Sequence, residues 1–82
     1  MVIIGFERSN FTASDNNEIK GYNVYLSREI APDRGQGNAV EKVYLTDRKL
    51  DLNHIDLNDL FEAEVHIYYN RYGKVERIVP VG

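Results

Sequence analysis

The sequence predicts a small, mostly-β domain in which five strands are interrupted by one short helical connection between the third and fourth. Three observations support this prediction. Apolar and polar residues alternate with period two in several separate segments. Clusters of Asn, Asp, Gly and Pro stand between those segments and are typical of turns. A Thr or Asp that can cap the start of a helix stands where the third strand ends.

The first two strands are predicted to form a long hairpin. Residues 2–12 alternate loosely and form the first strand. Residues 13–17 are Ala, Ser, Asp, Asn and Asn, a run that favours a turn because Asn and Asp bond to their own backbone. Residues 18–30 alternate more clearly, and we expect one face of this second strand to be buried. The residues on that face are Tyr22, Val24 and Leu26.

A flexible loop at residues 31–38, which contains one Pro and two Gly, leads into the third strand at 39–46. There Lys42 and Tyr44 point away from the face that holds Val43 and Leu45. Thr46 or Asp47 is positioned to cap a helix start, and Asp56 to cap a second short turn. We therefore expect irregular or short helical structure between the third and fourth strands.

The fourth strand, at residues 61–72, has the cleanest alternation in the chain. One face holds Phe61, Ala63, Val65, Ile67 and Tyr69, and the intervening residues fall on the other. A turn at residues 72–74 then leads to a last strand at 75–81, which stops near Pro80.

Three strands, a short helical connection and two further strands are the order of the OB-fold, a five-stranded Greek-key barrel of about this size. A barrel suits a thin core because closure removes exposed sheet edges. An SH3-like barrel, or a sheet with one helix, is the alternative. We predict a single OB-like domain over residues 1–82.

Composition favours a cytoplasmic location. Cysteine is absent, which excludes a disulfide framework and a thiolate metal site. The first residues lack the basic region and the long apolar run of a signal peptide. No stretch approaches the roughly 20 apolar residues of a membrane span. We therefore expect no membrane partner.

The formal net charge of −3 counts against a generic polyanion binder, but the charge is distributed unevenly. Residues 47–64 hold six acids and two bases, a net charge of −4. Residues 65–82 hold three bases and one acid, a net charge of +2. An acidic region and a mildly basic end can therefore coexist on one domain.

A catalytic or metal site is not expected. His54 and His66 fall in different elements without metal-ligand spacing, and no orienting partner is evident for either. The Gly residues form neither a phosphate loop nor a dinucleotide fingerprint. Residues 51–59 are rich in oxygen ligands, but Ile55 occupies the neighbourhood where a calcium loop needs Gly. We expect no enzyme activity, no cofactor and no metal.

Exposed tyrosines with basic neighbours are the strongest functional signal. Tyr25 and Tyr44 point away from the predicted core, and Tyr72 lies at the last turn, whereas Tyr22 and Tyr69 follow the apolar faces and are expected in the core. An exposed aromatic can stack a base, and OB-folds bind oligonucleotides over strands two and three and at the 1–2 and 4–5 loops. A structural role in cross-strand pairing is the alternative. The residues predicted to converge on this surface are Lys20, Tyr25, Lys42, Tyr44, Arg71, Tyr72 and Lys74.

Three patches carry a family resemblance: Phe11-Thr12 with a turn and then Gly21-Tyr22, the alternating residues 40–46, and residues 72–81 with their Gly turn and terminal Pro. In these patches the chain resembles the small single-stranded-DNA-binding, helix-destabilising proteins of filamentous phages and related mobile elements. The resemblance implies an OB-like barrel, a homodimer, and cooperative coating of single strands through exposed Tyr, Phe and basic residues.

Tyr25, Tyr44 and Arg71 are the positions that this resemblance assigns to DNA contact. The acidic segment 47–64 departs from what a DNA-coating protein needs. Either this segment weakens tight, non-specific binding, or it lies on the side of the domain away from the DNA.

The sequence thus predicts a non-enzymatic nucleic-acid-binding module from a bacterial or phage-like mobile element. We expect it to bind single-stranded DNA through aromatic stacking and a local basic stripe. The alternative is a protein-interaction or assembly module, with an acidic surface, a protein partner and no nucleic-acid binding.

Overall fold

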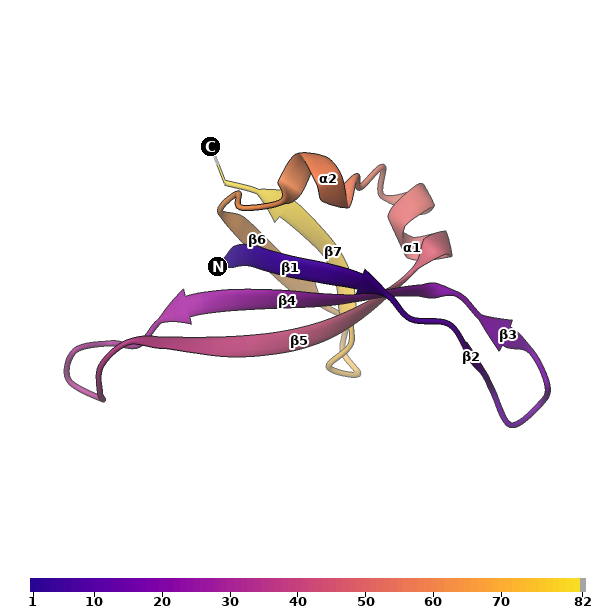
Figure 1. The fold of residues 1–82 in the computed structure, drawn as a ribbon, viewed down its shortest axis with the longest axis horizontal. Coiled ribbons are helices and arrows are strands. Elements are labelled where there is room, and N and C mark those ends of the chain that lie inside the picture. The colour runs from indigo at the N-terminus through magenta and orange to yellow at the C-terminus, as the bar shows by residue number, and fades with distance from the viewer. Residues whose placement is uncertain (82) are drawn as a thin grey trace.

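The computed structural model describes residues 1–81, and the mostly-β class predicted from the sequence is confirmed. Strands dominate, and two short helices stand together between the fifth and sixth of them (Figure 1). In chain order the elements are β1 (Val2–Arg8), β2 (Phe11–Thr12), β3 (Glu18–Ile19), β4 (Gly21–Glu29), β5 (Asn38–Thr46), α1 (Asp47–Leu52), α2 (Leu57–Leu60), β6 (Val65–Tyr69) and β7 (Val75–Pro80).

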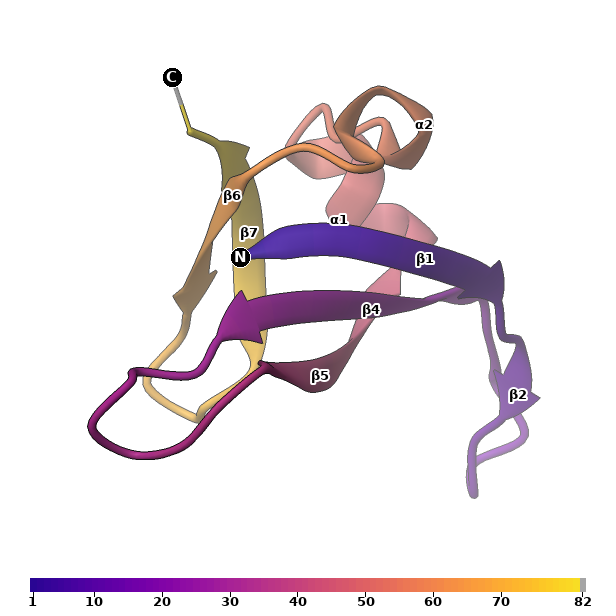
Figure 2. The same cartoon turned by 60° about the vertical axis from the view of Figure 1, so that its left-hand side comes forward.

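The strands form three antiparallel sheets. The largest has the order β1-β4-β5, and the hairpins β2–β3 and β6–β7 form the other two. The β6–β7 hairpin crosses the strands of the large sheet at a steep angle (Figure 2). Within residues 1–81 the strands do not close into a barrel, and β5 is an edge strand of its sheet.

The core lies between the large sheet, the two helices and the β6–β7 hairpin. Period-two alternation on β4 gives the strand one buried and one partly exposed face. Val24 and Leu26 are fully buried, whereas Asn23 and Tyr25, on the opposite face, are partly exposed. Each buried aliphatic side chain of this kind stabilises the fold by about 1.5–3 kcal/mol. The buried core consists of Ile3, Val24, Leu26, Leu45, Leu50, Leu57, Val65, Val75 and Ile78.

Both helix starts are capped by the residues that the sequence indicates. The Thr46 hydroxyl accepts a hydrogen bond from the Lys49 amide at 3.2 Å, and the Asp56 carboxylate accepts one from the Asn58 amide at 2.9 Å. Helices of six and four residues are unstable in isolation. Burial of one leucine from each helix, Leu50 and Leu57, therefore holds them in place.

The β6–β7 hairpin is attached to the rest of the fold at both ends. Near the N-terminus Val2 bridges Glu64, and the Val65 amide donates to the Met1 carbonyl at 2.7 Å. From α1, the Lys49 ammonium donates to the Val75 carbonyl at 2.7 Å. These contacts fix the position of the β6–β7 turn relative to β5.

The predicted first strand is divided in two. β1 ends at Arg8, and the chain leaves the sheet through Ser9 and Asn10 to form the separate β2–β3 hairpin. The Ser9 amide still bonds to the Gly21 carbonyl at 2.9 Å. The long hairpin therefore bends at this point, and its β2–β3 end projects away from the large sheet (Figure 1).

The prediction that Tyr69 belongs to the core is wrong. The strand β6 ends at Tyr69, the pairing register shifts between Tyr68 and Tyr69, and the Tyr69 side chain is 49% exposed. Alternation continues the apolar face from Val65 through Ile67, but at Tyr69 that face meets the groove described below instead of another element. Phe61, which precedes the strand, is also exposed.

Candidate nucleic-acid interface

A groove of about 720 Å³ lies along the edge strand β5, between the β2–β3 hairpin and the β6–β7 turn. Both of these segments project below β5 in the view of Figure 1. The groove therefore has β5 as its base, and two hairpins that are distant in the sequence form its sides. The aromatic and basic residues that line it are Phe11, Tyr44, Tyr69, Lys42, Lys49 and Lys74.

The three aromatic side chains come from three different segments. Phe11 is on β2, Tyr44 on β5 and Tyr69 at the end of β6. The rings of Phe11 and Tyr44 contact each other, with centroids 5.6 Å apart and an angle of 55° between their planes. Phe11 and Tyr69 are each about half exposed, at 47% and 49%. Their rings are thus available to a planar ligand.

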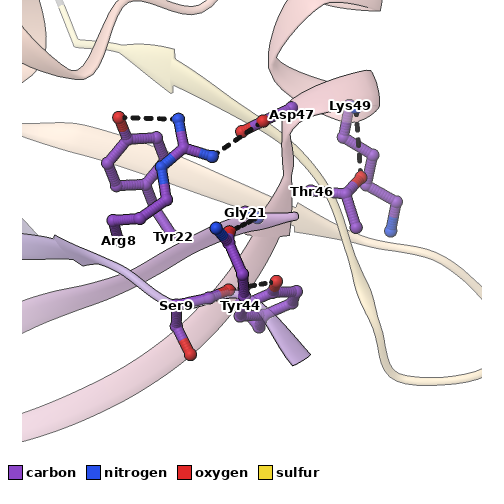
Figure 3. A network of polar contacts seen from close by, with 9 residues as sticks. Arg8, Ser9, Gly21, Tyr22, Tyr44, Thr46, Asp47 and Lys49 are labelled. Atoms are coloured by element: carbon purple, nitrogen blue, oxygen red, sulfur yellow. Dashed lines mark hydrogen bonds and ion pairs between the residues drawn. The ribbon is translucent and has the colours of Figure 1, made fainter. Parts of the chain in front are cut away.

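Tyr44 is held in a fixed orientation by contacts on two sides. Its hydroxyl donates a hydrogen bond to the Ser9 carbonyl at 2.6 Å (Figure 3). Its ring lies against Gly21, where an added Cβ would come within 2.8 Å of the ring carbon Cζ. A side chain at residue 21 would therefore clash with the ring and, more closely still, with the Leu45 carbonyl oxygen, and glycine allows both close approaches. Tyr44 is pre-organised before any ligand binds.

The groove has an excess of positive charge. Lys42 and Lys74 are exposed, and Lys49 is held at the groove wall by its bond to the Val75 carbonyl. Among the described residues that line the groove, Glu41 is the one acid, and its carboxylate forms an ion pair with Arg28 at 3.4 Å. An anionic ligand would therefore meet three lysines and one largely compensated carboxylate.

Three of the seven residues predicted from the sequence meet in this groove: Lys42, Tyr44 and Lys74. Tyr25 lies next to Lys42 across the β4–β5 pairing, on the outer face of the sheet. Its hydroxyl donates to the Glu7 carboxylate at 2.6 Å, outside the groove. This hydrogen bond, with desolvation and the charge of Glu7, raises the pKa of Tyr25 above its ordinary value.

Arg71 and Tyr72 lie at the β6–β7 turn, beside the groove but not among the residues that line it. The Arg71 guanidinium lies 4.9 Å from the centroid of the Tyr72 ring, which is 71% exposed. The turn is ordered by Asn70, whose side-chain oxygen accepts from the Tyr72 and Lys74 amides at 2.9 and 3.1 Å. These two residues can meet a ligand only where it leaves the groove.

Lys20, the remaining predicted residue, does not line the groove. It lies between β3 and β4 and lines a second hollow beside α1. Its backbone carbonyl accepts a bond from the Asp47 amide at 2.9 Å, which joins the hairpin to the helix start.

The groove residues that sequence reasoning missed include Phe11, Ile19, Lys49 and Tyr69. Phe11 and Ile19 face each other across the β2–β3 pairing. The turn at 13–17 was the available signal for them, because it puts both residues in the loop between the first two principal strands. The position of Lys49 depends on how α1 packs, and the exposure of Tyr69 depends on the register shift.

Segment 47–64 contributes Lys49 to the groove but none of its acids. The structure describes every residue from 47 to 64, and none of the six acids in that segment lines the groove. Asp47, the nearest along the chain to β5, forms an ion pair with Arg8 at 2.8 Å (Figure 3). The Arg8 guanidinium also donates to the Tyr22 hydroxyl at 3.2 Å.

Residues 1–81 hold no cluster of three or more His, Cys, Asp or Glu that could bind a metal ion. Among the helices in this part of the chain, none has the length and apolar character needed to cross a membrane. In comparisons with protein-family models, curated proteins and solved structures, no match to this chain was found.

Proposed function

We propose that the chain is a non-enzymatic module that binds single-stranded nucleic acid, with single-stranded DNA as the expected ligand, in the groove beside β5. One observation supports this above the others. Three aromatic side chains from three segments share a groove with three lysines. Single-strand binders combine these two features, because bases stack on aromatic rings while cations follow the phosphates.

The aromatic rings favour unpaired bases over a duplex. In a duplex the base faces are stacked on one another and cannot reach a protein ring. In a single strand each base stacked on an aromatic side chain contributes about 1–3 kcal/mol of binding free energy. Phe11 and Tyr69 are exposed enough to stack a base, and Lys42 and Lys74 can neutralise the adjoining phosphates.

We also propose that β1, β4, β5, β6 and β7 form an open, OB-like arrangement. The bridge from Val2 to Glu64, which joins β1 to the start of β6, supports it, as does the approach of β7 to β5, because both strands line the groove. OB-folds bind oligonucleotides over strands two and three and at the 1–2 and 4–5 loops. The corresponding segments here are β5, the β2–β3 hairpin and the β6–β7 turn.

The resemblance to phage single-stranded-DNA-binding proteins extends this proposal to a homodimer that coats DNA cooperatively. Sedimentation of the free protein tests the dimer, and the steepness of the binding isotherm on long oligo-dT tests the cooperativity.

Fluorescence anisotropy of a labelled oligo-dT, titrated with the protein at low and then moderate salt, tests the binding itself. We expect micromolar or tighter affinity that weakens as salt rises, because binding releases counterions from the phosphates. Absence of binding at low salt would refute the proposed function. A hairpin duplex of the same length serves as the control and should bind more weakly.

The exposed acids of segment 47–64 favour a second candidate function, an assembly module with a basic protein partner. Asp51, Asp56, Asp59, Glu62 and Glu64 are all exposed. Recovery of one stoichiometric protein partner in a pull-down, unchanged by nuclease treatment, would support this function over the first.

A further inference from the structure

A second hollow of about 740 Å³ adjoins the groove on the side of β3 and α1. The two share three lining residues, Ile19, Thr46 and Lys49. A ligand that fills the groove and extends past Lys49 therefore enters the second hollow next.

The second hollow differs from the groove in chemistry. None of its lining residues is aromatic, so it offers no ring on which a base can stack. It contains the exposed cations Lys20 and Arg48 in addition to Lys49. Of its two acids, Asp47 is already paired with Arg8 at 2.8 Å, which leaves Glu18. Its cations are therefore in excess, and they are suited to phosphates.

We infer that a bound single strand continues from the groove into this second hollow, where Lys20 and Arg48 neutralise its phosphates without stacking its bases. The inference rests on the proposed function. It divides the site into a stacking part beside β5 and a phosphate-binding part beside α1. Strands of about 4 to 16 nucleotides occupy a single OB-fold, so a short strand fills the first part and a longer one fills both.

Because of this division, the effect of salt on affinity should depend on the length of the bound strand. Each neutralised phosphate of a single strand adds about 0.7 to the slope of log affinity against log salt concentration. Two additional contacts, from Lys20 and Arg48, should make the slope for an oligo-dT of about 12 nucleotides steeper by about 1.4 than that for one of about 4.

The test is the double variant Lys20→Ala with Arg48→Ala, titrated with both oligonucleotides over a range of salt concentrations. Neither change removes a backbone contact of the fold, because the Lys20 carbonyl still accepts from Asp47. Alanine is also a better helix former than arginine at residue 48. We expect the variant to reduce the slope for the long strand by about 1.4 and to leave the short strand unchanged.

A matched control is the double variant Arg34→Ala with Arg77→Ala. It removes the same charge from two exposed residues that line neither hollow, and both slopes should be retained. Equal slopes for the two lengths in the unmodified protein, or equal loss at both lengths in the Lys20/Arg48 variant, would overturn the inference and leave the proposed function standing. Failure of both lengths to bind the unmodified protein would refute the proposed function itself.

Discussion

The ring of Tyr44 lies directly against Gly21, so that a Cβ at residue 21 would approach its Cζ atom to 2.8 Å. These residues stand on neighbouring strands of the large sheet. The contact links a position without a side chain to the orientation of an aromatic ring in the groove.

Substitution of Gly21→Ala should force the added Cβ against the Leu45 carbonyl oxygen and the Tyr44 ring. Overpacking of this kind destabilises a fold by about 1–3 kcal/mol, which urea unfolding measures directly. Gly5→Ala is the matched control, because a Cβ there meets Tyr25 at an ordinary distance of 4.0 Å. A Gly21→Ala protein as stable as the Gly5→Ala protein would contradict both of these close contacts.

Substitution of Tyr44→Phe should separate the stability of the fold from ligand binding. The variant loses the hydrogen bond to the Ser9 carbonyl but keeps the ring. We expect a loss of about 0.5–1.5 kcal/mol in the free energy of unfolding, with little change in oligo-dT affinity at temperatures where the protein stays folded. A large loss of affinity would mean that the hydroxyl contacts the ligand.

The hydroxyl of Tyr25 should titrate above the ordinary tyrosine range, because its hydrogen bond to Glu7 and the nearby negative charge favour the protonated form. The raised pKa in the folded state means that this contribution to stability is fully present below about pH 10. It is lost as pH rises through the raised pKa. The Tyr25 ring signal in an NMR titration reports the pKa.

The Glu7→Gln variant should bring the Tyr25 titration back toward the ordinary value, since it removes the carboxylate. Glu29→Gln is the control, because Glu29 is exposed and lies at the far end of β4. If Tyr25 titrates identically in the Glu7→Gln and unmodified proteins, the 2.6 Å hydrogen bond is not formed in solution.

Substitution of Thr46→Ala should loosen α1. The Thr46 hydroxyl caps the helix by accepting from the Lys49 amide. Loss of such a cap reduces the free energy of unfolding by about 0.5–2 kcal/mol, and Thr46→Ser should restore most of it. Thermal unfolding of the three proteins compares them, and equal midpoints would show that the cap does not stabilise the helix.

Much of the fold could be predicted from local patterns. Alternation on β4 and β5 identified the buried face, and the capping residues Thr46 and Asp56 identified both short helices. These features depend on neighbours in the sequence. Closure of the sheet into a barrel depends on contacts between distant strands, and period-two patterns do not specify such contacts.

The candidate site was predictable only in part for the same reason. Lys42 and Tyr44 are on one strand, and period two puts their side chains on one face. Phe11 reaches the groove because the chain bends after Arg8, and Tyr69 reaches it because β6 ends there. Lys20 falls in the neighbouring hollow because it follows β3 at the bend. The positions of Phe11, Tyr69 and Lys20 do not follow from local periodicity.

Tyr68 and Tyr69 provide the most direct test of the central claim. They are adjacent and similarly exposed, at 45% and 49%. Tyr69 lines the groove, whereas the ring of Tyr68 lies under the Arg77 guanidinium and does not line it. A matched pair of alanine variants therefore removes equivalent rings inside and outside the groove.

The measurement is the affinity of labelled oligo-dT, by fluorescence anisotropy, for the Tyr69→Ala, Tyr68→Ala and unmodified proteins. Loss of one stacked base, worth about 1–3 kcal/mol, should weaken the Tyr69→Ala protein by about 5- to 150-fold. The Tyr68→Ala protein should stay within about twofold of the unmodified one, as for an ordinary surface change. Equal affinities for the two variants would contradict the groove as the binding site for single strands.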